Sequence, residues 1–148
     1  MVHTTLAPFF ERDLLRLKDE VASYKNEADL WVVKPHISNS AGNLCLHLIG
    51  NLNHFIGATL GNTGYVRERD KEFAEKNIPR ARLLADIDAV LGVVKNVLVN
   101  LPEETYEKEF PLPIGNNVMT TQQMLIYIFA HLSYHLGQIN YHRRLIEE

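Results

Sequence analysis

Hydrophobic residues recur at helical spacing near the start of the chain. Between residues 8 and 27, successive apolar positions are separated by four and three residues in turn, at Phe10, Leu14, Leu17, Val21 and Tyr24. This spacing lines one face of an α-helix. The proline at position 8 fits the first turn of a helix, where its missing N–H has no intrahelical partner. The pattern therefore predicts a first helix over residues 8–27.

A second amphipathic segment spans residues 40–60. Its apolar face carries Leu44, Leu48, Leu52 and Phe55. Serine and asparagine side chains at 38–40 can cap the first backbone N–H groups of a helix, and the Gly-Asn-Thr-Gly run at 61–64 predicts the turn that ends it. These signals predict a second helix over residues 40–60.

Two more helices are predicted in the second half of the chain. Leucine, isoleucine and valine recur at helical spacing between positions 83 and 101, which predicts a third helix over residues 79–101. Gly92 lies inside it, and glycine in a helix interior costs up to about 1 kcal/mol relative to alanine, so we expect it to permit close packing. Thr120 and Gln123 form a T-x-x-Q capping box, which predicts a fourth helix over residues 121–147.

Two long stretches connect these helices. Residues 65–77 are rich in charge and have room for a short helix. Residues 103–119 contain Phe-Pro-Leu-Pro-Ile-Gly at 110–115, which predicts an extended crossover or a hairpin loop. No segment has a convincing strand pattern. We therefore expect an all-α protein, a single domain over residues 1–148 that folds as a four-helix bundle with long crossover loops.

Composition narrows the function classes. Of the 148 residues, 46% are hydrophobic and 22% are charged, values typical of a globular protein. The net charge of −3 and the scattered basic residues argue against a nucleic-acid partner, and no apolar run approaches the roughly 20 residues of a membrane span. The first residues lack the pattern of a signal peptide, and the single cysteine, Cys45, has no partner for an internal disulfide. We therefore expect a cytoplasmic protein that binds neither nucleic acid nor membrane.

The strongest chemical signal is an H-x-x-x-H pair, His131 and His135, in the fourth predicted helix. Four residues of α-helix turn the chain by about 400°, so the two imidazoles lie on one face, roughly 6 Å apart along the axis, and can reach one metal ion. They flank the apolar face of the helix, where an unpaired polar group costs about 1–3 kcal/mol. A metal ion, other side chains or water would supply the missing partners.

His47 offers a third ligand from the second predicted helix, in the same apolar stripe as Leu44 and Leu48. A lone histidine in such a stripe is more often a hydrogen-bonded core residue than a ligand. With His131 and His135, however, it would complete a three-histidine site with at least one open coordination position, as catalytic metal sites have. The alternative is a hydrogen-bonded histidine network, with at most a structural ion.

Other polar residues fit a metal site less well. His54 and His142 each lie about 10 Å along a helix from a histidine of the triad, too far to bind the same ion, and are expected to line a pocket or the surface. Asn51, one turn after His47, would line the open side of the site or form a core hydrogen bond. Cys45 points about 160° away from His47, so we expect a packed thiol there.

Familiar catalytic motifs are absent. Metalloproteases of the H-E-x-x-H type need a glutamate directly after the first histidine, and Leu132 stands there instead. The chain also lacks a G-x-S-x-G elbow, a phosphate-binding glycine loop and a C-x-x-C pair. Tyr65, Arg67 and Arg69 in the charged stretch could contact a substrate, but an ordinary solvated loop is the favoured interpretation. The sequence therefore assigns no catalytic residue.

Two motifs resemble those of the DinB-like (DinB/YfiT) superfamily of metal-dependent four-helix-bundle proteins. The first is Asn-Leu-Cys-Leu-His-Leu at 43–48, which contains His47. The second comprises Thr-Thr at 120–121 and the His131-x-x-x-His135 pair, followed by Leu-Gly-Gln-Ile at 136–139. The segment at 50–57, Gly-Asn-Leu-Asn-His-Phe-Ile-Gly, resembles one uncharacterised branch. The resemblance covers essentially the whole chain.

The resemblance implies that His47, His131 and His135 hold a divalent metal ion, usually zinc or nickel, and that the chain forms a homodimer. Some relatives are thiol-dependent transferases or isomerases that use low-molecular-weight thiols such as bacillithiol or mycothiol. Many relatives carry a basic residue where this chain has Leu136. This difference argues against assigning the substrate of any particular relative to this chain. We therefore expect a divalent-metal-dependent enzyme, either a thiol-dependent S-transferase or a hydrolase. The alternative is a non-catalytic, dimeric metal-binding or stress-related bundle protein.

Overall fold

The computed structural model describes residues 2–148. Most of the fold consists of four long helices: α1 (Val2–Ser23), α2 (Ala41–Leu52), α4 (Arg80–Asn100) and α5 (Thr121–Ile146). A π-helical segment, η2 (Asn53–Leu60), continues α2. The connections hold one short helix, α3 (Arg69–Ala74), and two 3₁₀ turns, η1 (Glu27–Trp31) and η3 (Glu103–Thr105). No β-strand occurs within the described residues, so the all-α prediction is confirmed.

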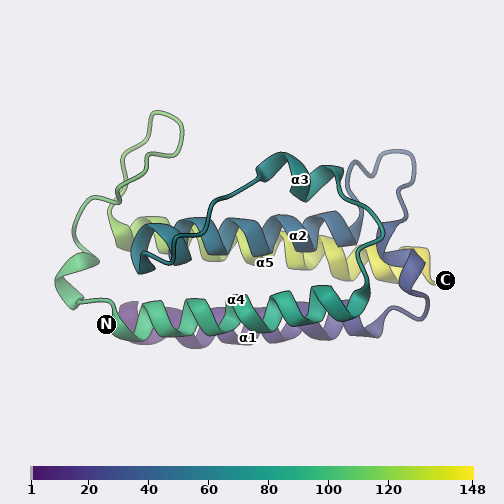
Figure 1. The fold of residues 1–148 in the computed structure, drawn as a ribbon, viewed down its shortest axis with the longest axis horizontal. Helices are drawn as coiled ribbons and strands as arrows, with labels where there is room; N and C mark the ends of the chain where they lie inside the picture. Colours follow the sequence, from purple (N-terminus) through teal and green to yellow (C-terminus); the bar gives the residue numbers. More distant parts are fainter. Residues whose placement is uncertain (1) are drawn as a thin grey trace.

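The four long helices pack as two layers (Figure 1). In one layer α1 lies against α4, and in the other α2 lies beside α5. Contacts of α1 with α5, and of α2 with α4, join the layers. The short helix α3 packs on the outer side of α2. This arrangement places α2 and α5, which hold the three predicted ligands, next to each other.

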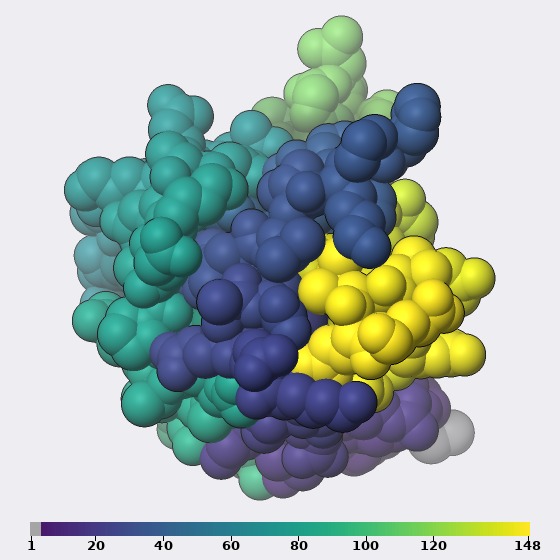
Figure 2. All heavy atoms as spheres, turned by 90° about the vertical axis from the view of Figure 1, so that its right-hand side faces the viewer, coloured from purple at the N-terminus to yellow at the C-terminus, as the bar shows by residue number. Residues whose placement is uncertain are grey.

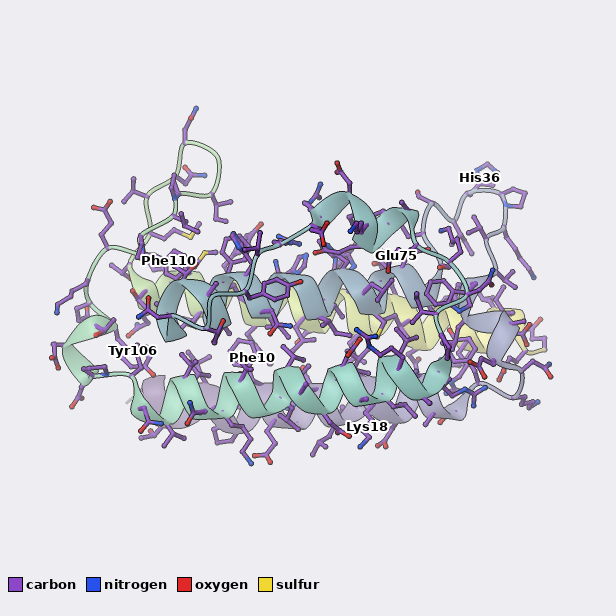
Figure 3. All side chains as sticks on the ribbon, in the orientation of Figure 1. Phe10, Lys18, His36, Glu75, Tyr106 and Phe110 are labelled. Atoms are coloured by element: carbon purple, nitrogen blue, oxygen red, sulfur yellow. The ribbon has the colours of Figure 1, made fainter. Side chains whose placement is uncertain are left out.

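The predicted apolar stripes form the core between the layers. Every residue of the α1 stripe is at most 1% exposed, and Figure 3 shows Phe10 lying between the layers. The α2 stripe is buried as predicted up to Leu52. In η2, however, the fully buried residue is Ile56, whereas Phe55 is only partly buried. A π-helix has more residues per turn than an α-helix, and this moves the apolar face by one position.

Capping side chains define the starts of the two helices that hold the histidines. Ser40 Oγ accepts a hydrogen bond from the backbone N–H of Asn43, at 3.2 Å, and so caps α2. Thr120 and Gln123 form the predicted reciprocal capping box at the start of α5. Because both starts are fixed by side chains, the histidines farther along each helix have a defined register.

The structure corrects two predictions about helix interiors. The first helix begins at Val2, so Pro8 lies inside α1 rather than in its first turn. Leu6 is only 6% exposed, and its burial extends the apolar face of α1 beyond the proline. Gly92 does not mediate close packing, because it is exposed and a Cβ atom there would meet no heavy atom within 4 Å.

The stretch between α4 and α5 forms the hairpin loop rather than an extended crossover. Antiparallel bridges pair Glu109 with Thr120 and Ile114 with Asn117. The loop projects from one end of the bundle, beyond the two layers (Figure 1). No helix in the described part of the chain is long and apolar enough to cross a membrane.

Candidate metal centre

Three imidazoles meet between α2 and α5. His131 Nε2 lies 3.1 Å from His47 Nε2 and 3.1 Å from His135 Nε2. One ring nitrogen from each residue lies within 4.8 Å of the other two, a grouping that could hold a metal ion. Nitrogen ligands about 2.0–2.1 Å from a tetrahedral zinc ion are themselves about 3.3 Å apart. The two 3.1 Å separations are therefore close to those of nitrogens that share one ion.

A carboxylate from α3 determines the tautomer of His47. Its Nδ1 atom lies 3.0 Å from Glu72 Oε1 and 3.3 Å from Arg67 Nη2. A guanidinium cannot accept a hydrogen bond and a carboxylate cannot donate one, so Nδ1 cannot satisfy both neighbours. The shorter contact is the hydrogen bond, in which Nδ1–H donates to Glu72. The Nε2 atom of His47 then presents its lone pair to the other two histidines.

Two hydrogen bonds from the Arg67 guanidinium stabilise Glu72 as an anion. Arg67 Nε donates to Oε2 and Arg67 Nη2 donates to Oε1, both at 2.9 Å, which is the bidentate geometry of a strong pair. Burial alone would raise the pKa of Glu72, but the hydrogen bonds from His47 and Arg67 outweigh it and the pKa is lowered. The Arg67 side chain is only 11% exposed. The interpretation of Arg67 as part of a solvated loop is therefore wrong, because this arginine is paired and nearly buried.

The position of Glu72 depends on Gly50. A Cβ atom at Gly50 would overlap the Glu72 carboxylate, so any side chain on this turn of α2 would displace it. Asn43, fully buried in α2, donates hydrogen bonds to the carbonyl oxygens of Glu72 and Glu75 at 2.9 and 2.8 Å. Figure 3 shows Glu75 where α3 ends beside α2. The close approach at Gly50 and the hydrogen bonds from Asn43 thus attach α3 to α2 and place Glu72 next to His47.

Gln138 acts on His135 as Glu72 acts on His47. Its Oε1 atom lies 2.7 Å from His135 Nδ1, and its Nε2 atom donates to Tyr134 Oη at 3.3 Å. Because the amide oxygen can only accept, His135 Nδ1 bears the proton and its Nε2 lone pair points toward His131. The i,i+3 spacing of His135 and Gln138 on one helix was a signal for this pair in the sequence. For Glu72 the sequence gives no comparable signal, since it lies in a separate crossover.

His131 cannot satisfy both neighbours without a cation. Its Nε2 atom faces two unprotonated nitrogens and carries at most one proton, which can be donated to only one of them. Its Nδ1 atom is buried and has no hydrogen-bond partner within the described residues. A metal ion would instead accept all three Nε2 lone pairs. The donor set therefore fits a divalent ion better than it fits a hydrogen-bonded histidine network.

Burial lowers the pKa of His131 and of His135. Desolvation, with smaller contributions from His135 and His47, lowers the pKa of His131 to about 4. Burial also lowers the pKa of His135, although its hydrogen bond with Gln138 acts in the opposite direction. Both rings are therefore neutral at pH 7, which is the form of imidazole that binds metals.

The remaining predicted residues fall outside the ligand cluster. Asn51 is 9% exposed, and its Oδ1 atom has no hydrogen-bond partner in the described structure, which leaves the predicted core hydrogen bond of this oxygen unformed. His54 is half-buried beside the Phe55 ring. Cys45 is fully buried, and burial raises the pKa of its thiol to about 12, as expected of a packed thiol. Tyr65 is exposed on the crossover.

His142 has a structural role. It is 5% exposed, and its Nε2–H donates to the Val32 carbonyl at 2.8 Å. Its Nδ1 atom accepts a hydrogen bond from Tyr24 Oη at 2.7 Å. It lines a pocket, one of the two positions predicted for it, and it joins the end of α5 to the segment that follows η1.

Comparison with known protein families places the chain in a family. The model of a family described as "Protein of unknown function (DUF1572)" matches residues 9–148, which include all three histidines of the cluster. No curated protein matches the chain.

Proposed function

Because the chain belongs to the DUF1572 family, whose function is unknown, we propose a function from its own residues. The protein binds one divalent metal ion through the Nε2 atoms of His47, His131 and His135. It uses the ion as the centre of an enzyme site for small molecules. The supporting observation is the orientation of the rings: His131 Nε2 lies 3.1 Å from the Nε2 atoms of both His47 and His135, and those two rings each have an oxygen acceptor at Nδ1.

A thiol fits this site better than water as the activated molecule. A divalent ion would lower the pKa of a water or thiol that occupies an open coordination position. Hydrolysis also needs a general base, and the carboxylate that contacts the triad, Glu72, is fully engaged by Arg67 and His47. A thiol needs no such base, because its ordinary pKa of about 8.5 is already close to neutral. We therefore propose a thiol-dependent transferase rather than a hydrolase.

Asn51 is the residue best suited to contact the thiol substrate. It lies one helical turn after His47 on α2, and its buried Oδ1 atom has no partner. Such an atom costs about 1–3 kcal/mol unless something donates a hydrogen bond to it. An S–H or N–H group of a bound substrate would supply that donor. Asn51 thus orients the substrate in this proposal, and the metal ion supplies the acidity.

The resemblance to DinB-like proteins supports the same proposal. Some proteins of that superfamily use low-molecular-weight thiols, and the resemblance assigns the ion to the same three histidines. Zinc or nickel is the proposed metal, because imidazole ligands suit both ions. The homodimer implied by the resemblance stays a prediction.

Metal content tests the first part of the proposal. We expect about one divalent ion per chain in protein purified without a nickel column, and a large loss of metal in the His131→Ala variant. The measurement is elemental analysis of both proteins by mass spectrometry. Equal, substoichiometric metal in the two proteins would contradict the metal site.

Turnover tests the second part. We expect metal-dependent conjugation of a low-molecular-weight thiol to an electrophilic acceptor such as 1-chloro-2,4-dinitrobenzene. In this reaction the sulfur forms a bond to the ring carbon, chloride leaves with the electron pair of its bond, and the thiol proton passes to solvent. A protein that holds stoichiometric metal, yet shows no turnover with several thiols and acceptors, would favour the non-catalytic alternative.

A further inference from the structure

A pocket of about 410 Å³ adjoins the three-histidine cluster. It lies between residues 36–39 and the C-terminal half of α5, and His135 forms part of its wall. Figure 2 shows the chain near residues 30–40, in dark blue, beside the yellow end of α5. The volume is in the range of small-molecule sites, about 300–1,000 Å³. The pocket therefore has room for a substrate that also reaches the metal ligands.

Apolar groups make up most of the surface of the pocket wall, and its polar residues are histidines, Ser38, Asn39 and Gln138. Its apolar members include Leu44, Tyr134, Tyr141 and Leu145, and none of its residues is Asp, Glu, Lys or Arg. The hollow beside α3 differs, because acidic and basic residues line it together. The hollow between α1 and α5 is likewise charged. A wall without lysine, arginine or carboxylate side chains offers an ionic molecule no salt-bridge partner of these types, and its apolar surface favours a neutral, apolar body.

Exposed aromatic side chains border this pocket. Tyr134 is 64% exposed and Tyr141 is 61% exposed, and the two are one heptad apart on α5. Leu145 is 40% exposed beside them. Burial of such apolar surface under a ligand is favourable in proportion to the area removed from water. The pocket thus offers binding energy to an apolar molecule without any rearrangement of the core.

The pocket is also connected to the metal ligands by hydrogen bonds. Gln138 lines it and holds His135 at Nδ1, while the other end of the same amide contacts Tyr134. Beneath it, His142 is fixed by Tyr24 and by the Val32 carbonyl. Hydrogen bonds therefore hold Gln138 and His142 in place in the wall next to the metal ligands.

We infer that this pocket binds the uncharged, largely apolar body of the substrate, whose donor atom reaches the metal ion beside His135. This inference rests on the proposed function, because it requires an ion at the three histidines. It assigns a substrate class: a thiol that carries an aromatic or aliphatic group, rather than a small or anionic thiol.

The experiment compares thiols that share a head group. Cobalt(II)-loaded full-length protein is titrated with ethanethiol, 2-phenylethanethiol and 3-mercaptopropionate, and the sulfur-to-cobalt charge-transfer band reports binding. We expect 2-phenylethanethiol to bind at least about tenfold more tightly than ethanethiol, since its ring would be buried in the pocket. We expect no such advantage for 3-mercaptopropionate, whose carboxylate meets no lysine or arginine on the pocket wall.

A matched pair of variants locates the effect. Tyr141→Ala removes part of the pocket wall and should abolish most of the advantage of 2-phenylethanethiol over ethanethiol. Tyr127→Ala removes another exposed tyrosine of α5, 46% exposed and outside the pocket, and should preserve the advantage. Circular dichroism confirms that both variants fold.

The outcomes separate the two proposals. Equal affinity for ethanethiol and 2-phenylethanethiol, or equal losses in the two variants, would overturn the pocket assignment while the charge-transfer band still supports the metal site. Tighter binding of 3-mercaptopropionate would overturn the uncharged substrate class. Absence of a band with every thiol would overturn thiol binding at the metal, and the pocket assignment with it.

Discussion

At the scale of single residues, the protons on three imidazoles decide what the cluster can bind. His47 and His135 each donate Nδ1–H to an oxygen acceptor, so their Nε2 lone pairs face inward. His131 lies between them and has no partner at Nδ1 within the described residues. The two acceptors, Glu72 and Gln138, thus orient the Nε2 atoms of His47 and His135 toward the centre of the cluster without a bound cation.

The charge of Glu72 should matter for metal affinity. In the Glu72→Gln variant, the acceptor for His47 remains but the negative charge that increases the basicity of the ring is lost. We expect metal to bind about 10–100-fold more weakly, which competition with a chromophoric chelator measures. Glu68→Gln is the control, because Glu68 is 62% exposed and pairs with Lys71. Equal affinities in the two variants would contradict the role of Glu72.

The three ligands could be predicted from the sequence, whereas their main supporting residue could not. His131 and His135 share a helix, so their spacing alone fixes their relation, and His47 stands out as a polar residue in an apolar stripe. Glu72 reaches His47 only because a crossover folds back onto α2. That docking depends on tertiary contacts such as those of Asn43, for which helical periodicity contains no information.

At the scale of elements, the helices follow their capping signals and apolar spacing, and the deviations have local causes. The apolar face shifts from Phe55 to Ile56 because η2 is π-helical. The hydrophobic pattern cannot reveal this change, since both residues are apolar and adjacent. This π-helical segment, η2, directly follows the helix that holds His47 and packs against α4.

Helix α4 contains a glycine that the fold does not need. A methyl group at Gly92 meets no heavy atom within 4 Å, and the residue is exposed in the middle of the helix. Gly92→Ala should therefore raise the free energy of unfolding by about 0.5–1 kcal/mol, through the smaller entropy of the unfolded chain. Urea denaturation measures the change. A destabilised variant would show that Gly92 has a packing role after all.

At the scale of the whole molecule, the metal ligands connect elements that are distant in sequence. One ligand comes from α2 and two come from α5, so the complete donor set exists only when the layer of these two helices has formed. The bundle therefore brings the site together, and the site in turn should stabilise the bundle.

Metal binding should raise the stability of the folded chain. At a free metal concentration about 100 times the Kd, linkage adds about 2.7 kcal/mol to the free energy of unfolding. Chelation should reverse the gain, and the His131→Ala variant should respond to neither treatment. Thermal unfolding followed by circular dichroism, with zinc or with chelator, measures both. An equal response in the variant would show that metal acts elsewhere on the chain.

The space left by Gly50 has an evolutionary consequence. The Glu72 carboxylate occupies the volume that any side chain at position 50 would take. A homologue with alanine or a larger residue at the position of Gly50 cannot keep the carboxylate at its place over the histidine. The two positions should therefore covary across the family, so that glycine and glutamate are inherited together or lost together. An alignment in which they vary independently would show that lineages of this family orient the α2 histidine in different ways.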